Sequence, residues 1–159
     1  MTTATVGQLQ GTALDAWRAY LKSHASILRA LDAELVAEHG LTTRDYEVLL
    51  YLAQAPERKL PMSSLASQTM LTRSGITRLI DGLVGAALIE RVACVEDARV
   101  SYARLTDAGY EKVRRAGVTH AAGIRLLFLA NFNVQEVEQL AELLGRLPGA
   151  QTGGACTVE

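Results

Sequence analysis

Two short segments that begin with hydroxyl side chains, followed at once by a β-like ribbon, constrain the fold of this chain more than any other feature. The first segment begins at Ser63 and the second at Thr72. Because such side chains accept hydrogen bonds from the free amides at a helix start, we expect two short helices here. The ribbon runs over 88–93, turns through 96–99 and returns over 100–105. This is the layout of a winged helix-turn-helix, whose second helix enters the DNA major groove.

Long amphipathic segments flank this lobe. Between residues 8 and 39, apolar residues recur at helical steps of three, four and seven: Leu14, Trp17, Leu21, Leu28, Leu31 and Leu35. We expect one helix of about 30 residues, ended by Gly40, whereas the average helix has about 11–12 residues. The simplest use for the excess length is contact with a partner subunit. Further helices are expected to begin at Thr106 and at Val134.

The expected fold is therefore mainly α with a small β-ribbon. We expect a single domain over 1–159, with a winged helix-turn-helix lobe at 42–106. Dimerisation helices are expected over 8–39 and 107–147, and a flexible tail over 150–159. Within the lobe, Thr42 and Asp45 have the spacing of a capping box, which predicts another helix start.

Composition excludes several classes of protein. The 159 residues are 49% apolar and 21% charged, which is typical of a globular domain. No apolar run approaches the roughly 18 residues of a membrane span, and the N-terminus has no secretory signal, so we expect a cytoplasmic protein. Two distant cysteines, Cys94 and Cys156, predict neither a disulfide framework nor a metal site, and no cofactor is expected.

Charge is distributed unevenly along the chain, although the net charge is only −1. Residues 58–80 contain four basic residues and no acidic residue, whereas residues 1–57 contain seven acidic and four basic residues. Positive charge is therefore concentrated around the second short helix, where a DNA phosphate backbone would favour it.

The second helix offers side chains suited to reading base edges. Arg78 is the best candidate, through a bidentate contact with guanine or with a phosphate. Thr72, Arg73, Ser74 and Thr77 lie on the same half of the helix and are expected to contact bases or backbone. The alternative for each arginine is a solvated surface charge.

The wing offers a second contact. Arg99 near its tip is suited to the minor groove, and Asp97 is placed to hold the guanidinium by a charge-assisted hydrogen bond. The alternative is an exposed ion pair of little energetic weight. Asp81 is expected to be structural, because phosphates would repel its carboxylate, and to pair with Arg78 or with an arginine of the wing.

Together these fragments resemble the MarR (multiple antibiotic resistance regulator) family of bacterial transcription factors. The fragments that carry the resemblance are 40–42 (GLT), 65–66 (LA), 76–83 (ITRLIDGL), 88–91 (LIER), 97–99 (DAR) and 105–109 (LTDAG). The resemblance covers roughly residues 10–147. Two departures are Ala98, where many members have a second wing arginine, and the less polar pair Cys94-Val95.

The resemblance implies a triangular homodimer, with interlocked terminal helices and two winged lobes that read a pseudopalindromic operator in double-stranded DNA. It implies a regulator, usually a repressor of nearby genes, released by a small and often phenolic or aromatic effector; activation stays open. Trp17, Tyr20, His24 and Tyr46 are the candidate effector contacts, with core packing as the alternative. Of the other histidines, His39 is expected to interact with a helix dipole and His120 to be on the surface.

Other functions have less support. A redox-responsive regulator would use Cys94, but thiol-sensing relatives carry their cysteine in the first helix, and here Cys94 is better explained as a small apolar filler. An enzyme is not expected, because no Gly-rich phosphate loop, HExxH or GxSxG motif occurs. A winged-helix protein–protein adaptor is compatible with the fold, and it predicts that Arg73, Arg78 and Arg99 are dispensable.

Overall fold

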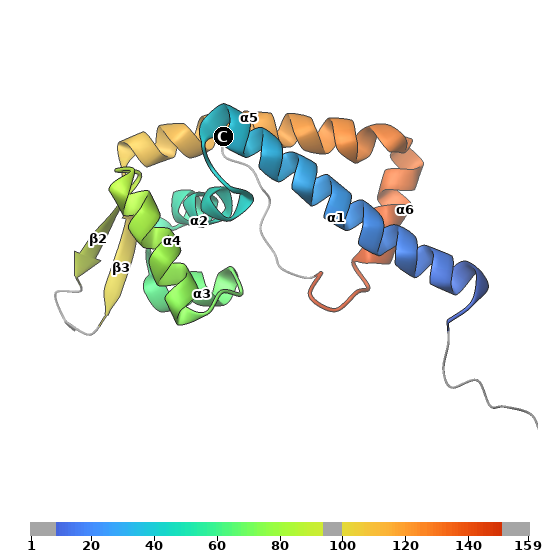
Figure 1. Ribbon diagram of the computed structural model, residues 1–159, viewed down its shortest axis with the longest axis horizontal. Coiled ribbons are helices and arrows are strands. Elements are labelled where there is room, and N and C mark those ends of the chain that lie inside the picture. The colour runs from blue at the N-terminus through green and yellow to red at the C-terminus, as the bar shows by residue number, and fades with distance from the viewer. Residues whose placement is uncertain (1–8, 94–99, 151–159) are drawn as a thin grey trace, which may run out of the picture.

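The computed structural model describes residues 9–93 and 100–150. In chain order its elements are α1 (Gly11–His39), α2 (Thr43–Gln54), η1 (Pro56–Arg58), β1 (Lys59–Pro61), α3 (Met62–Gln68), α4 (Arg73–Gly85), β2 (Ile89–Ala93), β3 (Ser101–Leu105), α5 (Asp107–Leu127), η2 (Leu129–Asn131) and α6 (Val134–Leu144). Helices α2, α3 and α4 and the strands form a lobe at one end, while α1 and α5 extend past it towards α6 at the other end (Figure 1). The expected mainly α fold with a winged helix-turn-helix lobe is confirmed.

Local capping sets the helix starts that the sequence predicted. The Thr42 hydroxyl accepts a hydrogen bond from the Asp45 amide (3.1 Å), and the Asp45 carboxylate accepts one from the Thr42 amide (2.9 Å), so the capping box is complete. Thr106 caps α5 in the same manner, with its hydroxyl accepting from the Gly109 amide. Helix α1 ends at Gly40, whose φ of 63° is the left-handed conformation that glycine adopts without strain.

One predicted cap is wrong. Ser63 does not begin α3, because that helix starts one residue earlier at Met62, and Pro61 is the N-cap residue. The φ of Pro61 is −59°, which its ring fixes and which is compatible with both the end of a strand and the start of a helix. Met62 is consequently the first residue of the helix.

The sheet has three antiparallel strands in the order β1-β3-β2. The predicted ribbon is confirmed as β2 and β3, with Ile89 opposite Leu105. Strand β1 adds to the other edge of β3 and places Leu60 opposite Ala103. Because Ala103 is completely buried, the centre of the sheet faces the core of the lobe.

The core joins the sheet to five of the helices. Its fully buried large apolar side chains are Leu35 of α1, Val48, Leu49 and Leu52 of α2, Leu65 of α3, Ile76 and Ile80 of α4, Ile89 of β2 and Val113 of α5. At the start of α5, Gly109 allows a close approach to the wing. A Cβ atom there would collide with the Leu88 carbonyl oxygen and would lie 2.7 Å from Leu105 Cδ1.

The apolar stripe of α1 is only partly covered by this chain. Leu31 and Leu35 are buried, but Trp17, Leu21 and Leu28 on the same face are 51%, 45% and 43% exposed. Helix α6 is amphipathic and has no buried residue. The N-terminal part of α1 and the whole of α6 lie where the molecule extends away from the lobe (Figure 1). No helix in the described ranges is both long enough and apolar enough to cross a membrane.

Candidate nucleic-acid interface

Helix α4 divides its side chains between the core and an open groove. Thr72 caps the helix, its hydroxyl accepting from the Gly75 amide (3.1 Å). Ile76, Ile80 and Leu83 are buried on one side. The other side lines an open groove of about 760 Å³, formed by Thr72, Arg73, Ser74, Thr77, Arg78 and Asp81. The α4 residues that the sequence singled out as DNA contacts therefore share one exposed surface.

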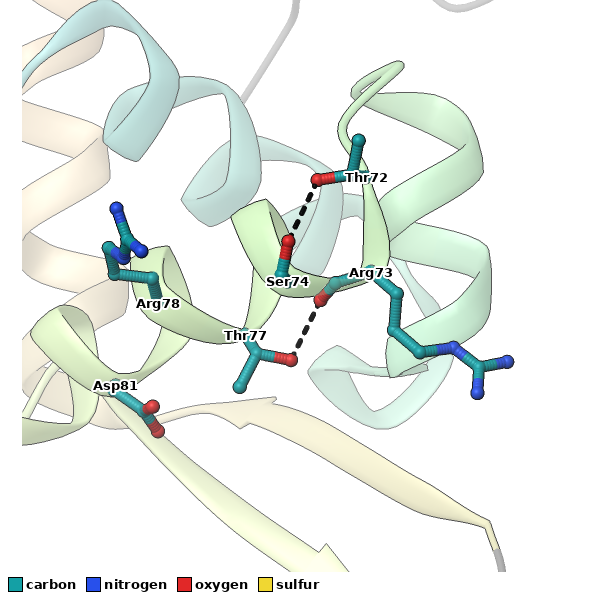
Figure 2. Close-up of a pocket in the computed structure, with 6 residues that line it drawn as sticks. All are labelled: Thr72, Arg73, Ser74, Thr77, Arg78 and Asp81. Carbon is teal, nitrogen blue, oxygen red and sulfur yellow. Dashed lines mark hydrogen bonds between the residues drawn. The ribbon is translucent and has the colours of Figure 1, made fainter.

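The two arginines stand at opposite edges of this surface. Figure 2 shows the Arg73 and Arg78 side chains pointing away from each other, with Thr77 and Ser74 between them. Neither arginine forms an ion pair with another residue in the described part of the chain. The described residues therefore leave the donors of each guanidinium available, and guanidinium donors match phosphate oxygens and the O6 and N7 acceptors of guanine.

The hydroxyl groups between the arginines are held by local bonds. The Thr77 hydroxyl donates to the Arg73 carbonyl (2.8 Å), and the Thr72 and Ser74 hydroxyls lie 3.2 Å apart. Thr77 consequently has no free hydroxyl donor in this conformation, but it keeps its lone pairs and its methyl group. A threonine methyl group is of the kind that packs against thymine methyl groups in DNA-binding proteins.

Asp81 is paired with the wing. Arg91 of β2 donates to its carboxylate with a distance of 2.6 Å, which confirms the expected pairing with a wing arginine and excludes Arg78 as the partner. In Figure 2 the Asp81 carboxylate lies on the side of α4 that faces the strands. Arg91 itself was not named among the residues predicted from the sequence. The signal that pointed to such a residue is Asp81, because an acidic side chain on a DNA-reading helix is favoured when a cation lies beside it.

The described part of the wing is also held by charge. Arg104 of β3 donates to Glu90, directly opposite on β2, at 2.6 Å. The predicted contacts Asp97 and Arg99, the departure Ala98 and the candidate redox residue Cys94 all lie outside the described residues, as does Cys156. Their roles stay predictions.

The candidate effector residues fall into two places. Trp17, Tyr20 and His24 form a ladder along α1, with ring centroids 6.0 Å apart at each step. Tyr46 is instead buried in the core of the lobe, with its ring centroid 4.8 Å from that of His120. The structure therefore brings three of the four residues together.

His120 is not the surface residue that the sequence predicted. The buried Nδ1 atom of His120 has no hydrogen-bond partner among the described residues, and the ring packs against Tyr46. Burial lowers the pKa of His120, while the nearby Glu34 carboxylate acts in the opposite direction. The prediction failed because the contact of His120 with Tyr46 of α2 is a tertiary one, which no local pattern in α5 indicates. His39 also has a tertiary partner, since its Nε2 lies 2.8 Å from the Thr119 hydroxyl of α5.

Comparisons with known proteins agree with this geometry. Residues 39–100 match the MarR family. The chain is 27% identical over 111 residues to the HTH-type transcriptional repressor YetL of Bacillus subtilis, a match that covers 70% of this chain and 66% of YetL.

Two solved structures from Streptomyces coelicolor are similar over most of the chain. AbsC, a MarR family transcriptional regulator, has a TM-score of 0.81 and 30% identity, covering 87% of this chain and 93% of AbsC. Sco3205, a MarR family regulator solved in complex with DNA, has a TM-score of 0.81 and 28% identity, covering 89% and 88%. The chain therefore belongs to the MarR family and is a winged helix-turn-helix transcriptional regulator.

Proposed function

We propose that the protein is a homodimeric repressor that binds a pseudopalindromic operator, with α4 in the major groove. The observation that carries this proposal is the open groove of α4, which has at each edge an arginine that forms no ion pair with a described residue. The one acidic residue of the groove, Asp81, is neutralised by Arg91. The similarity to Sco3205, which was solved in complex with DNA, and to the repressor YetL supports the same function.

Each groove residue has a role in this proposal. Arg78 binds a guanine edge, and Arg73 binds a phosphate at the other edge of the groove. Thr72 and Ser74 lie at the N-terminus of α4, where the helix dipole favours a phosphate. Thr77 contacts a thymine methyl group. Asp97 and Arg99, which lie between β2 and β3 in the sequence, are proposed to act in the minor groove.

The uncovered apolar faces support a homodimer. Leu21, Leu28 and Trp17 continue the apolar stripe of α1, of which only Leu31 and Leu35 are buried within the chain. A second protein surface is needed to cover the rest of this stripe. Helix α6 offers a matching apolar face with no buried residue of its own. A dimer related by a twofold axis presents two α4 helices, and its half-sites lie about 10 bp apart if both helices enter one face of the DNA.

Selection of binding sequences from a random duplex pool, followed by footprinting, tests this proposal. We expect an inverted repeat with two protected major grooves about one helical turn apart. Recovery of no preferred sequence in repeated selections would contradict operator recognition and would favour a protein–protein adaptor.

The aromatic ladder of α1 supports an effector site. Trp17 and Tyr20 stack on each other near the N-terminal end of the proposed dimer face, and this chain leaves both partly exposed, so an aromatic ligand can pack against the rings where the partner subunit does not cover them. In this proposal a phenolic or aromatic effector binds there and releases the DNA. Trp17 is the one tryptophan of the chain, so its fluorescence reports binding directly. Titration with a panel of phenols and aromatic acids should quench Trp17 and dissociate the operator complex at the same concentrations.

The proposal places the protein in the bacterial cytoplasm with its operator DNA.

A redox response through Cys94 would differ from effector release in one measurable way. Operator affinity would fall on oxidation and return with a thiol reductant, and a Cys94→Ser variant would be insensitive.

A further inference from the structure

Arg44, at the start of α2, contacts the turn that precedes α4, the proposed reader helix. Its guanidinium Nη1 donates to the Thr69 carbonyl at 3.1 Å, over a separation of 25 residues. The same nitrogen lies 3.2 Å from the Glu47 carboxylate, one helical turn further along α2. Glu47 in turn accepts a hydrogen bond from the Tyr51 hydroxyl. Arg44 is thus held on its own helix while it binds a different one.

The carbonyl that Arg44 binds is at a critical place in the lobe. Thr69 is the C-cap residue of α3, a helix of only seven residues, and is 1% exposed. Met70 follows with a φ of 52°, a left-handed conformation that a non-glycine residue adopts at a cost. Thr72, the cap of α4, follows two residues later. Movement of the Thr69 peptide would therefore displace the N-terminus of the reader helix.

Arg44 is also next to the point where α1 holds α2. The Asp32 carboxylate of α1 accepts hydrogen bonds from the Thr43 amide (2.7 Å) and from the Thr43 hydroxyl (2.8 Å). Asp32 of α1 therefore holds Thr43, and the next residue along the chain, Arg44, holds the Thr69 carbonyl. These contacts join the long helix that carries the proposed dimer face to the turn that starts α4.

We propose that Arg44 is a positioning residue for operator recognition, which fixes the α3–α4 turn relative to α2 and α1 by binding the Thr69 carbonyl. Arg44 does this without contacting DNA itself. This inference rests on the proposed function, because it assigns to Arg44 a role in placing the same α4 surface. The bond sets the positions of Arg73 and Ser74 at the start of α4. Through these positions it affects the preference for operator over random DNA.

The chain provides a matched control. Arg114 of α5 pairs with Glu111 in the same spacing of three residues, and its side chain is 53% exposed compared with 55% for Arg44. Arg114 lacks the bond to the turn. Loss of Arg114 therefore removes an equivalent surface charge and ion pair but leaves the Thr69 carbonyl bound.

The test compares the full-length wild type with Arg44→Ala, Arg44→Lys and Arg114→Ala by fluorescence anisotropy, on a selected operator and on a random duplex, at several salt concentrations. We expect Arg44→Ala to bind the operator about tenfold more weakly, since a charge-assisted hydrogen bond is lost, and to bind random DNA like wild type. The slope of log affinity against log salt should not change. Arg44→Lys, which can donate one hydrogen bond, should recover part of the preference, and Arg114→Ala should match wild type.

Hydrogen exchange of the free protein gives an independent readout. The amides of Met70 to Ser74 should exchange faster in Arg44→Lys and Arg44→Ala than in Arg114→Ala. If Arg44→Ala does not fold, both measurements are made on Arg44→Lys instead.

Three results would overturn the inference. Equal operator preference in wild type and Arg44→Ala would show that the bond does not position α4. A salt slope reduced by about one in Arg44→Ala would make Arg44 a phosphate contact instead. Failure of the wild type itself to prefer the operator would overturn the proposed function and this inference together, whereas the first two results leave the proposed function standing.

Discussion

The guanidinium of Arg91 lies 2.6 Å from the carboxylate of Asp81 and ties the first strand of the wing to the reader helix. The pair has two consequences. It fixes the angle between β2 and α4, and it neutralises the one negative charge in the groove that would face DNA phosphates. Both residues are partly exposed, so the expected effect is on DNA binding more than on folding.

Loss of Arg91 alone should therefore weaken operator binding more than loss of both Arg91 and the charge of Asp81. Arg91→Ala leaves the Asp81 charge uncompensated, and we expect operator affinity to fall several-fold, most strongly at low salt. The double variant Asp81→Asn with Arg91→Ala should recover much of that loss, because the repelling charge is gone. Equal affinity of the single and double variants would show that repulsion by Asp81 is not the cause.

Replacement of Gly109 should destabilise the lobe. In Gly109→Ala the new methyl group would meet the Leu88 carbonyl oxygen and Leu105, both of which belong to the packed wing. We expect a loss of roughly 2–4 kcal/mol in the free energy of unfolding, measured by urea denaturation. Gly82→Ala is the matched control. It meets no atom within 4 Å, so it should stabilise α4 by about 1 kcal/mol, and a similar loss in both variants would contradict the packing argument.

The fold could be predicted from the sequence where its causes are local. Thr42, Thr72 and Thr106 cap their helices as expected, because a cap is decided by residues three positions apart. Gly40 ends α1 for an equally local reason. The error at Ser63 has the same origin, since two plausible helix starts lie two residues apart and the rigid ring of Pro61 favours the earlier one.

Features that depend on tertiary contacts were not predicted. The pairing of β1 with β3 joins residues more than 40 positions apart, and nothing in the local pattern indicates the partner. The choice of Arg91 over Arg78 for Asp81, and the bond from Arg44 to Thr69, depend on how helices and strands pack. The α4 face itself was predicted completely, because helical spacing alone places those side chains together.

Stability should depend on the ionisation of His120. Its pKa is lowered by burial below the usual value of 6.5, so the folded protein binds a proton less readily than the unfolded chain. The contribution of neutral His120 is therefore complete above pH 6.5 and is lost as the pH falls from there through the folded-state pKa. Urea denaturation at pH 7.5 and 5.5 should show a smaller decrease in His120→Gln than in wild type. An equal decrease in the free energy of unfolding in both proteins would show that another group causes the pH dependence.

A charge on the exposed stripe of α1 should separate the subunits. Leu28→Glu places a carboxylate on the face that we propose is buried in the dimer, where it would have no partner. Sedimentation equilibrium should show a monomer, with weaker operator binding as a result. Met70→Glu is the control for the oligomeric state alone, because Met70 is 89% exposed and lies in the turn between α3 and α4. A stable dimer in both variants would show that the proposed interface is wrong.

The most direct test of the account is an anisotropy titration of the selected operator and a random duplex with wild type and Arg78→Ala, at several salt concentrations. The wild type should bind the operator tightly, with log affinity falling linearly with log salt, and should bind random DNA far more weakly. Arg78→Ala should bind both duplexes alike. Full operator affinity and preference in Arg78→Ala would contradict the assignment of the α4 groove as the surface that reads DNA.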